Sequence, residues 1–392
     1  MYPKQTLICS ALLMFLMGLG SRRQFRFESA TGPFVQNLNA LAQSRVETAP
    51  HDDTIVYYLE QVDPTYAEQL PPAIVRRLVR MKALDPARLY GMFTVVVDGT
   101  GQLFFHARHC EHCLTRTLAD GRVLYFHPVL EAKLVTPDGY AFSLATEFIE
   151  NLDPAATKQD CELKAFARLA ETLKRHFPQL PLLLLGDALY ANQTVFAICR
   201  ANDWRFIFTF KSGSLPAVFV EYETLRDLEP QNRGERREGP VLQRFAWVND
   251  LDYEGHRLAA FECRETCQDK EHYFAWITDL KVGCASVVTL ANRGGRLRWK
   301  IENEGFNIQK NGGYELEHAY SQNENAGKIF YFLLQVAHAL NQLMIKGGLL
   351  GDFAKTFGSI RNYLRRLAES LRGVVIDPPD PGPPTPRVLD SS

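Results

Sequence analysis

The sequence has no excess of charge of either sign, few cysteines and no detectable internal repeat. Its 44 Lys and Arg residues balance 45 Asp and Glu residues to a formal net charge of -1, so the chain as a whole lacks the strongly basic balance of many nucleic-acid-binding proteins. Eight cysteines in 392 residues are too few for a small secreted disulfide framework, which favours a reducing cytosol. Binding surfaces must therefore be sought in local segments.

The sequence also has little that is apolar enough for a membrane. The longest apolar run near the N-terminus, Leu7–Leu19, has 13 residues, too few to span a bilayer. It resembles the core of a signal peptide, but no A-x-A cleavage site follows and the basic pair Arg22 and Arg23 lies on its far side. We therefore expect a buried helix that stops at Gly18 and Gly20, and no membrane partner.

The order of predicted elements is that of an α/β protein. Helical periodicity fills much of 54–89, which predicts a helical N-terminal region at 1–91. Strands are predicted next at 92–98, 102–109 and 122–129, then a helix at 160–176, a strand at 180–187, a helix at 191–202 and a strand at 205–210. A three-strand meander followed by helix, buried strand, helix and strand is the order of a ribonuclease H-like fold.

The rest of the chain is divided by composition. Short alternating segments at about 212–282 predict a β-rich insertion within a catalytic domain that spans 92–350. Helical periodicity resumes near 297 and continues at 326–345. A basic C-terminal helix is predicted at 351–373, and the proline-rich residues 374–392 are predicted to be disordered.

Asp98 and Asp187 each follow an apolar, strand-like run. Gly-Thr-Gly after Asp98 predicts a turn that exposes its carboxylate at the strand end, and Asp187 follows LPLLLLG. Aspartates at the ends of adjacent strands can face one crevice, where their charges repel unless they are protonated or bridged by a cation. A single such aspartate is more often a turn or helix-cap residue, but the pair favours a divalent metal site.

A third carboxylate is expected from a helix beside these strands, and the segment 296–310 (RLRWKIENEGFNIQK) offers Glu302 and Glu304. This segment, with VVVDGTG and LLLLGDALYAN, resembles transposases of bacterial insertion sequences in the Asp-Asp-Glu (DDE) superfamily, in the branch with a β-rich insertion and the signature Y-x2-R-x3-E-x6-K. Arg298 and Glu302 occupy the R and E positions, which favours Glu302 over Glu304. The resemblance covers roughly 93–343.

Two positions depart from that signature. The Tyr position holds Gly295, and the Lys position holds Gln309 with Lys310 one residue later. On an ideal helix Lys310 would lie about 80° around the axis from Glu302, so a long lysine could still reach the same groove.

The resemblance implies a DNA transposase that cleaves transposon ends and transfers them into target DNA. Asp98, Asp187 and Glu302 would be the catalytic residues and the ligands of two Mg²⁺ or Mn²⁺ ions, about 3.5 to 4 Å apart. A homodimer would pair two inverted ends in the bacterial cytoplasm, at the nucleoid. A catalytically decayed DNA-binding relic and a ribonuclease H-like nuclease without strand transfer are the alternatives.

Two basic segments are expected to contact DNA phosphates. Residues 293–310 contain five Lys or Arg against two Glu, and residues 346–372 contain six Lys or Arg against one Asp and one Glu. Phosphate contacts position DNA with little base specificity. The predicted DNA-binding residues are Arg298, Lys300, Lys310, Arg361, Arg365 and Arg366.

Cys110 and Cys113, in the run HCEHC, have the spacing of half a zinc site, for which Cys263 and Cys267 could supply the other half. Nothing in the sequence guarantees that the two pairs meet.

Three further features have simpler interpretations. Glu162, with Asp160, is expected to begin a helix, and Trp247 and Trp276 are expected in the core, although either could stack on an extruded DNA base.

Overall fold

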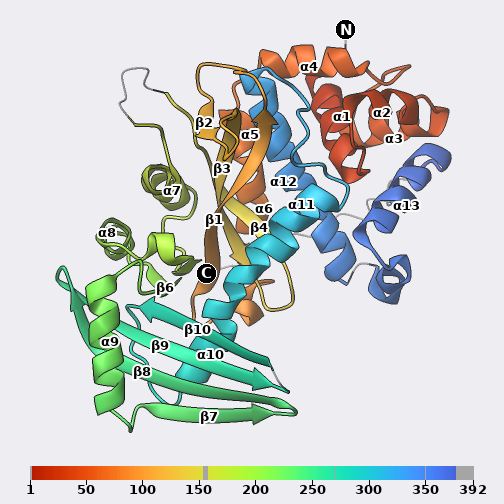
Figure 1. Ribbon diagram of the computed structural model, residues 1–392. Coiled ribbons are helices and arrows are strands. Elements are labelled where there is room, and N and C mark those ends of the chain that lie inside the picture. The colour runs from red at the N-terminus through yellow and green to blue at the C-terminus, as the bar shows by residue number, and fades with distance from the viewer. Residues whose placement is uncertain (1, 153–157, 269, 349, 377–392) are drawn as a thin grey trace, which may run out of the picture.

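The computed structural model describes residues 2–152, 158–268, 270–348 and 350–376. Its centre is one mixed sheet of ten strands, in the order β2-β3-β1-β5-β6-β10-β9-β8-β7, with β4 also paired to β3 (Figure 1). The strands are β1 (Phe93–Phe105), β2 (Leu114–Thr117), β3 (Val123–Val135), β4 (Ala141–Phe148), β5 (Leu182–Gly186), β6 (Arg205–Thr209), β7 (Arg233–Glu238), β8 (Val241–Tyr253), β9 (His256–Cys267) and β10 (Lys270–Thr278). The protein is therefore an α/β protein, as predicted.

The two halves of the sheet differ in strand direction. β1 is antiparallel to β3, which is antiparallel to β4. β5 is parallel to β1 on its other side, and β6 is parallel to β5. β10 then joins antiparallel to β6 and carries the remaining strands of the insertion.

The meander differs from the one predicted. The predicted strands 92–98 and 102–109 are one strand, β1, which runs through Gly99–Gly101 with a register shift after Gly101. β3 also pairs with Gly99–Gly101. A turn there would break these backbone hydrogen bonds, so the strand continues. The meander is instead β1-β3-β4, and Asp98 lies within a strand and not at its end.

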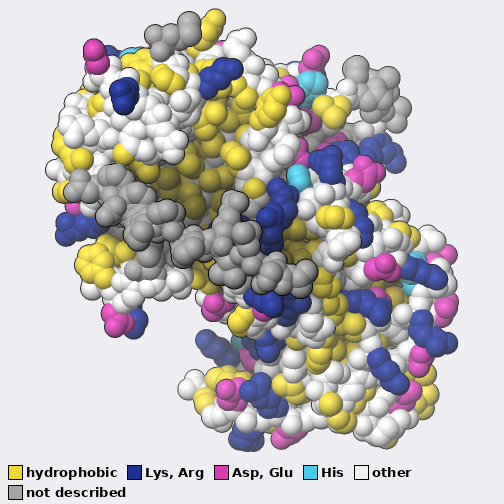
Figure 2. Space-filling view, turned by 180° about the vertical axis from the view of Figure 1, so that it is seen from behind, with side chains coloured by type: hydrophobic (Ala, Val, Ile, Leu, Met, Phe, Trp, Pro, Cys, Tyr) yellow, Lys and Arg dark blue, Asp and Glu magenta, His cyan; other side chains and the backbone are white. Residues whose placement is uncertain are grey.

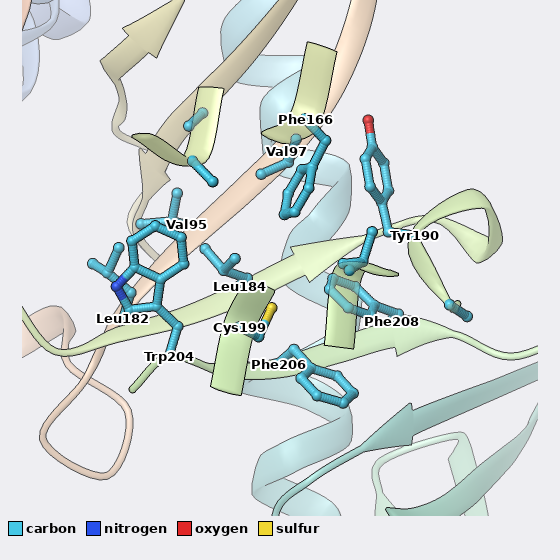
Figure 3. Close-up of a cluster of buried hydrophobic side chains, with 14 of the residues drawn as sticks. Val95, Val97, Phe166, Leu182, Leu184, Tyr190, Cys199, Trp204, Phe206 and Phe208 are labelled. Carbon is cyan, nitrogen blue, oxygen red and sulfur yellow. The ribbon is translucent and has the colours of Figure 1, made fainter. Parts of the chain in front are cut away.

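The central strands are buried on both faces, and alternate side chains serve different cores. Val95, Val97, Leu184 and Phe208 face a core that α7 (Glu162–His176) and α8 (Gln193–Ala201) cover, and Figure 3 shows these side chains with Phe166, Tyr190 and Trp204. On the opposite face lie Val96, Leu183, Leu185 and Ile207. They pack with Leu290, Leu297, Ile301 and Phe306. These residues belong to three consecutive helical segments, α10 (Val287–Arg293), η3 (Gly295–Arg298) and the π-helix η4 (Ile301–Phe306), and α11 (Asn307–Asn311) follows η4.

The insertion contains a helix as well as strands. α9 (Pro216–Leu228) precedes β7 and packs against β8. The sequence analysis predicted only strands at 212–282, because the two helical anchors Val218 and Tyr222 are too few for a visible period. Trp247 on β8 and Trp276 on β10 are buried, as predicted, and belong to the core that also holds Ile301.

A helical region packs on the long helix α12. It comprises α1 (Lys4–Leu16), α2 (Arg22–Glu28), α3 (Gly32–Ala42), α4 (Asp52–Glu60), α5 (Thr65–Glu68), α6 (Leu70–Arg80) and η1 (Asp85–Ala87) from the N-terminal side, with α12 (Glu324–Lys346), η5 (Gly351–Phe357) and α13 (Ile360–Gly373). Figure 1 shows α1, α2 and α3 grouped with α13, away from the insertion. α1 and α12 share a core.

The predicted buried helix at 7–19 is confirmed. α1 ends at Leu16, and Gly18 follows with φ of 64°, a backbone conformation that glycine adopts without strain. Within the described residues, no helix combines the length and the apolarity that a membrane crossing requires.

The predicted C-terminal tail begins with ordered contacts. The Asn37 amide donates to the Val374 carbonyl (2.7 Å) and accepts from the Ile376 backbone N–H (2.7 Å). The rest of the predicted tail, 377–392, lies outside the described residues.

A fully buried ion pair fastens the sheet to α12. Glu131 and Lys133 on β3 lie 3.0 Å apart. Glu131 also accepts from Ser143 (2.7 Å), from Thr146 and from Tyr331 (2.9 Å) on α12, and Lys133 donates to Gln335 (2.6 Å). Burying two charges is costly, and removing one of them leaves the other unpaired.

We predict that Lys133→Met destabilises the protein by about 3 to 5 kcal/mol, because Glu131 would remain buried without its cation. The measurement is urea unfolding at neutral pH. The double variant Glu131→Gln/Lys133→Met should regain most of the loss, and Lys82→Met, at an exposed position, should change little. If Lys133→Met alone is as stable as the wild type, the ion pair contributes no net stability.

Candidate active site

Asp98 lies on β1, and Asp187 directly follows β5, the parallel strand beside β1. The β1–β5 register pairs Val96 with Leu185, so the two aspartates are level, each two residues further along. Asp98 accepts from the Gly99 backbone N–H (3.0 Å), and Asp187 accepts from Leu189 N–H (2.8 Å) at the start of η2 (Ala188–Tyr190). The predicted pairing of these two carboxylates at one place on the sheet therefore agrees with the strand register.

The charges at this place act on one another. The pKa of Asp98 is raised to about 6, first by burial and also by the negative charges of Glu162 and Asp187. The positive charge of Arg298 opposes this rise. A proton or a cation would relieve the repulsion among the carboxylates.

Arg298 approaches Asp98 from the helical segment on the same face of the sheet. Its guanidinium Nη1 lies 3.5 Å from Asp98 Oδ2. Leu297 and Ile301, on either side of Arg298, are buried against the sheet, so they fix the direction of the arginine. The resemblance put Arg298 beside Glu302 as a DNA-phosphate contact, whereas the structure places it beside Asp98.

Side-chain packing explains why glycine stands at position 295, the Tyr position of the signature. A Cβ added at Gly295 would overlap the indole ring of Trp276. The aromatic volume beside η3 therefore comes from β10 of the insertion, and a tyrosine at position 295 would not fit without displacing Trp276.

The Lys position of the signature does not face the aspartates. Gln309 is fully buried and donates to Gln335 (2.8 Å), and Lys310 pairs with Glu317 (2.8 Å). The helical-wheel expectation for Lys310 assumed a regular α-helix. The intervening η4 is a π-helix, whose i to i+5 hydrogen bonds change the angular position of every later residue.

The two candidate glutamates on η4 have different surroundings. Glu304 pairs with Lys300 (3.4 Å) and Lys346 (3.0 Å), and its carboxylate lies against Gly139 in the β3–β4 turn. Glu302 is exposed, and among the described residues it makes no side-chain hydrogen bond or ion pair. The carboxylate of Glu304 is thus paired with two lysines. Glu302 lies on the same segment, which packs against β1, and its carboxylate could bind another group.

Glu162 is an acidic neighbour that sequence reasoning assigned only to a helix start. It does begin α7, but its carboxylate also lies over Gly99, where any Cβ would collide with it. It accepts from the Tyr190 hydroxyl (3.2 Å), and burial together with the charge of Asp187 raises its pKa. Its companion Asp160 instead pairs with Arg168 (2.6 Å). The only sequence signal was an acid beginning the helix between the meander and the second aspartate's strand.

The acids do not form a closed metal cage. In the part of the chain that the structure describes, no group of three carboxylates that includes Asp98 or Asp187 has its oxygen atoms within 4.8 Å of one another. A third carboxylate would have to rotate toward the aspartates to share an ion with them.

The other predicted DNA-binding residues lie away from the aspartates or carry partners. Lys300 pairs with Glu304. On α13, Arg361 donates to the Asn311 carbonyl (2.7 Å), Arg365 lies 3.4 Å from Asn362 Oδ1, and Arg366 pairs with Glu369 (3.0 Å). These three arginines are exposed, and exposed pairs of this kind are weak. They remain free to exchange their partners for phosphates.

Comparisons of the chain with protein families and with characterised proteins found no match. The functional argument therefore depends on the geometry around Asp98 and on the signature residues of the segment 296–310.

The raised pKa of Asp98 leads to a prediction about stability in the absence of divalent ions. A carboxyl with a folded pKa near 6 favours the folded state below its usual pKa of about 3.9 and loses that contribution as the pH rises through 6. We therefore expect Asp98→Asn to be more stable than the wild type at pH 8, by at most about 3 kcal/mol. This advantage should vanish at pH 4.

Thermal unfolding in a chelator, measured from pH 4 to pH 8, tests this expectation. Asp252→Asn, at an exposed position on β8, is the matched control and should follow the wild type. An Asp98→Asn variant that is equally destabilised at every pH would contradict the electrostatic account.

Proposed function

We propose that the protein is a DNA transposase that uses divalent metal ions to cleave transposon ends and to join them to target DNA. The observation that carries the proposal is that Asp98 and Asp187 each come two residues after a register pair of the parallel strands β1 and β5, with Arg298 at 3.5 Å from Asp98. Asp98 and Arg298 are both parts of the sequence pattern that resembles the DDE transposases. Their contact across 200 residues is independent support for that resemblance.

The strand order supports a ribonuclease H-like core for this activity. In the order β4-β3-β1-β5-β6, the strands β4 and β1 are both antiparallel to β3, and β5 and β6 continue parallel to β1. The predicted order of meander, helix, strand, helix and strand is kept, although the meander consists of β1, β3 and β4 and not of the predicted strands. The insertion then extends the same sheet beyond β6 before the chain returns through α10 to η4. This path is consistent with the branch whose insertion separates the second aspartate from the glutamate.

Glu302 is the third carboxylate that we favour. Strand alternation puts Asp98 on the face of β1 that also carries Val96, and Val96 shares a core with Leu297 and Ile301. Glu302 follows Ile301 directly, and none of the described side chains is paired with it. Glu162, from the α7 side, is the competitor, because its charge already acts on Asp98.

The ligand chemistry fits a hard cation. Carboxylate oxygens select Mg²⁺ or Mn²⁺, and such ions stabilise the charge on the attacking and leaving oxygens of a phosphodiester. Asp98 must lose its proton to serve as a ligand. Arg298 would exchange part of its interaction with Asp98 for a DNA phosphate, which it can bind through two N–H groups.

The second candidate is a nuclease of the same fold without strand transfer. The position of Glu162 favours it, because with Glu162 all three acids come from the sheet and α7. The glutamate of the transposase-like segment would then be unnecessary for cleavage. The variants below separate the two candidates.

We predict that Asp98→Asn and Asp187→Asn each reduce Mn²⁺-dependent cleavage by about two orders of magnitude or more, because several kcal/mol of charge stabilisation depend on the metal. The substrate is duplex DNA taken from the two sequences that flank the gene, and binding measured in parallel should persist. Cleavage at the wild-type rate by either variant would contradict the proposal.

Three glutamine variants then identify the third ligand. Glu302→Gln should lose cleavage and strand transfer together, whereas Glu304→Gln, the matched control on the same helix, should retain both. Loss in Glu162→Gln with an active Glu302→Gln would assign the third ligand to Glu162. If the wild type then also cleaves without joining, the nuclease is the better description.

The DNA-binding surface is expected to include α13. Figure 2 shows Lys and Arg side chains gathered between the helical region and the insertion, on the face opposite to that of Figure 1. The three exposed arginines of α13 add positive charge on the C-terminal side. Each neutralised phosphate on duplex DNA steepens the logarithmic salt dependence of binding by about 0.9.

We predict that neutralising Arg361, Arg365 and Arg366 to Gln weakens binding to all sequences alike and flattens the salt slope by up to about 2.7, which is three times the value for one contact. Fluorescence anisotropy at several salt concentrations measures both quantities. The control replaces Arg77, Arg80 and Lys82, which are exposed at and after the end of α6. If the two triple variants behave alike, α13 has no special role in DNA binding.

A further inference from the structure

A second cluster of metal-ligating side chains lies at the far end of the β1–β3 hairpin, apart from the aspartates. The loop between β1 and β2 brings Cys110 and Cys113 to His127 on β3. The two Sγ atoms are 3.6 Å apart, and His127 Nε2 lies 3.3 Å from Cys110 Sγ and 3.2 Å from Cys113 Sγ. Two sulfurs and an imidazole nitrogen thus converge within one small volume.

These separations are those of three corners of a zinc coordination tetrahedron. Zinc binds cysteine sulfur at about 2.3 Å and histidine nitrogen at about 2.0 to 2.1 Å, so a tetrahedral site has S···S of about 3.8 Å and S···N of about 3.5 Å. The measured separations of 3.6, 3.3 and 3.2 Å need only a small expansion to admit the ion.

The surroundings are also those of a metal-binding histidine. The other ring nitrogen of His127, Nδ1, lies 4.0 Å from a carboxylate oxygen of Glu150, and Glu150 is itself held by Lys328 at 2.8 Å. A carboxylate that is hydrogen-bonded to the outer nitrogen of a ligating histidine orients the ring and fixes its tautomer, and Glu150 lies next to that nitrogen, just beyond hydrogen-bond distance. The Cys110 backbone N–H points at Cys113 Sγ (3.4 Å), as suits a sulfur that carries negative charge.

The position for a fourth ligand faces a small cavity. This cavity of about 70 Å³ lies between the cluster and the start of α12, with His109 and His112 in its lining. Both ring nitrogens of His112 already face polar groups, Asn151 and the carboxylates of Glu111 and Glu324. His109 uses only Nε2, which lies 3.1 Å from the Gln322 carbonyl.

We propose that Cys110, Cys113 and His127 bind one structural Zn²⁺ ion, with His109 or a water molecule as the fourth ligand. The second half of the site comes from β3 and not from Cys263 and Cys267, which lie on β9 in the insertion. The metal joins the β1–β2 loop to β3 and supports the surface on which α12 begins. This proposal does not depend on the proposed transposase activity.

The experiment uses the full-length chain, purified from zinc-supplemented cells in a buffer with a phosphine reductant. Elemental analysis should find about one zinc per chain. Cys113→Ser and His127→Ala should each lose most of the metal. Cys161→Ser and Cys284→Ser, at exposed cysteines, should retain it, as should Asp98→Asn.

Cobalt replacement tests the ligand set without relying on a variant that folds. The wild-type protein, stripped of zinc and reloaded with Co²⁺, should show tetrahedral d–d bands and thiolate-to-cobalt charge-transfer bands. His109→Ala should leave the zinc content unchanged if the fourth ligand is water and should lower it if His109 is that ligand.

Zinc-free wild-type protein as isolated, with cobalt spectra lacking thiolate bands, would overturn the proposal. A Cys110–Cys113 disulfide that persists in the reductant would overturn it as well. A zinc content that survives both Cys113→Ser and His127→Ala would place the ion elsewhere.

Discussion

The parallel pairing of β1 with β5 is the constraint on which the candidate active site depends. It sets Asp98 level with Asp187 although 88 residues separate them in the chain. The pairing uses backbone hydrogen bonds, which form whatever the charge of the two side chains. The sheet is stable enough to hold two like charges together because both of its faces are buried. Burial, and after it the charges of Glu162 and Asp187, raise the pKa of Asp98.

Everything else at the site adjusts to that repulsion. Arg298 reduces it on one face, and Glu162 increases it from the other. The arginine is held by Leu297 and Ile301, so the hydrophobic core below η3 and η4 determines where a positive charge can stand. The insertion takes part as well, since Trp276 fills the space beside Gly295. A strained electrostatic arrangement is thus maintained by apolar packing, which is a common property of functional sites.

The polar interior beneath α12 has a different physical character. Glu131 and Lys133 neutralise one another and satisfy their hydrogen bonds with Ser143, Tyr331 and Gln335. Gln309, at the signature's Lys position, belongs to this network through Gln335. A residue that the motif would place at the catalytic face therefore serves the junction between the sheet and α12.

The sequence by itself determined the α/β class, the strand that carries Asp98, the strand that Asp187 follows, and the helices α1, α7, α12 and α13. These depend on local periodicity and on a short motif, which a single chain displays. Only the tertiary structure decided that β1 continues through Gly99–Gly101, that Glu162 reaches the aspartates, and that His127 completes the cysteine pair. Partner strands and neighbouring side chains fix these features, and their contacts join residues that no local pattern relates.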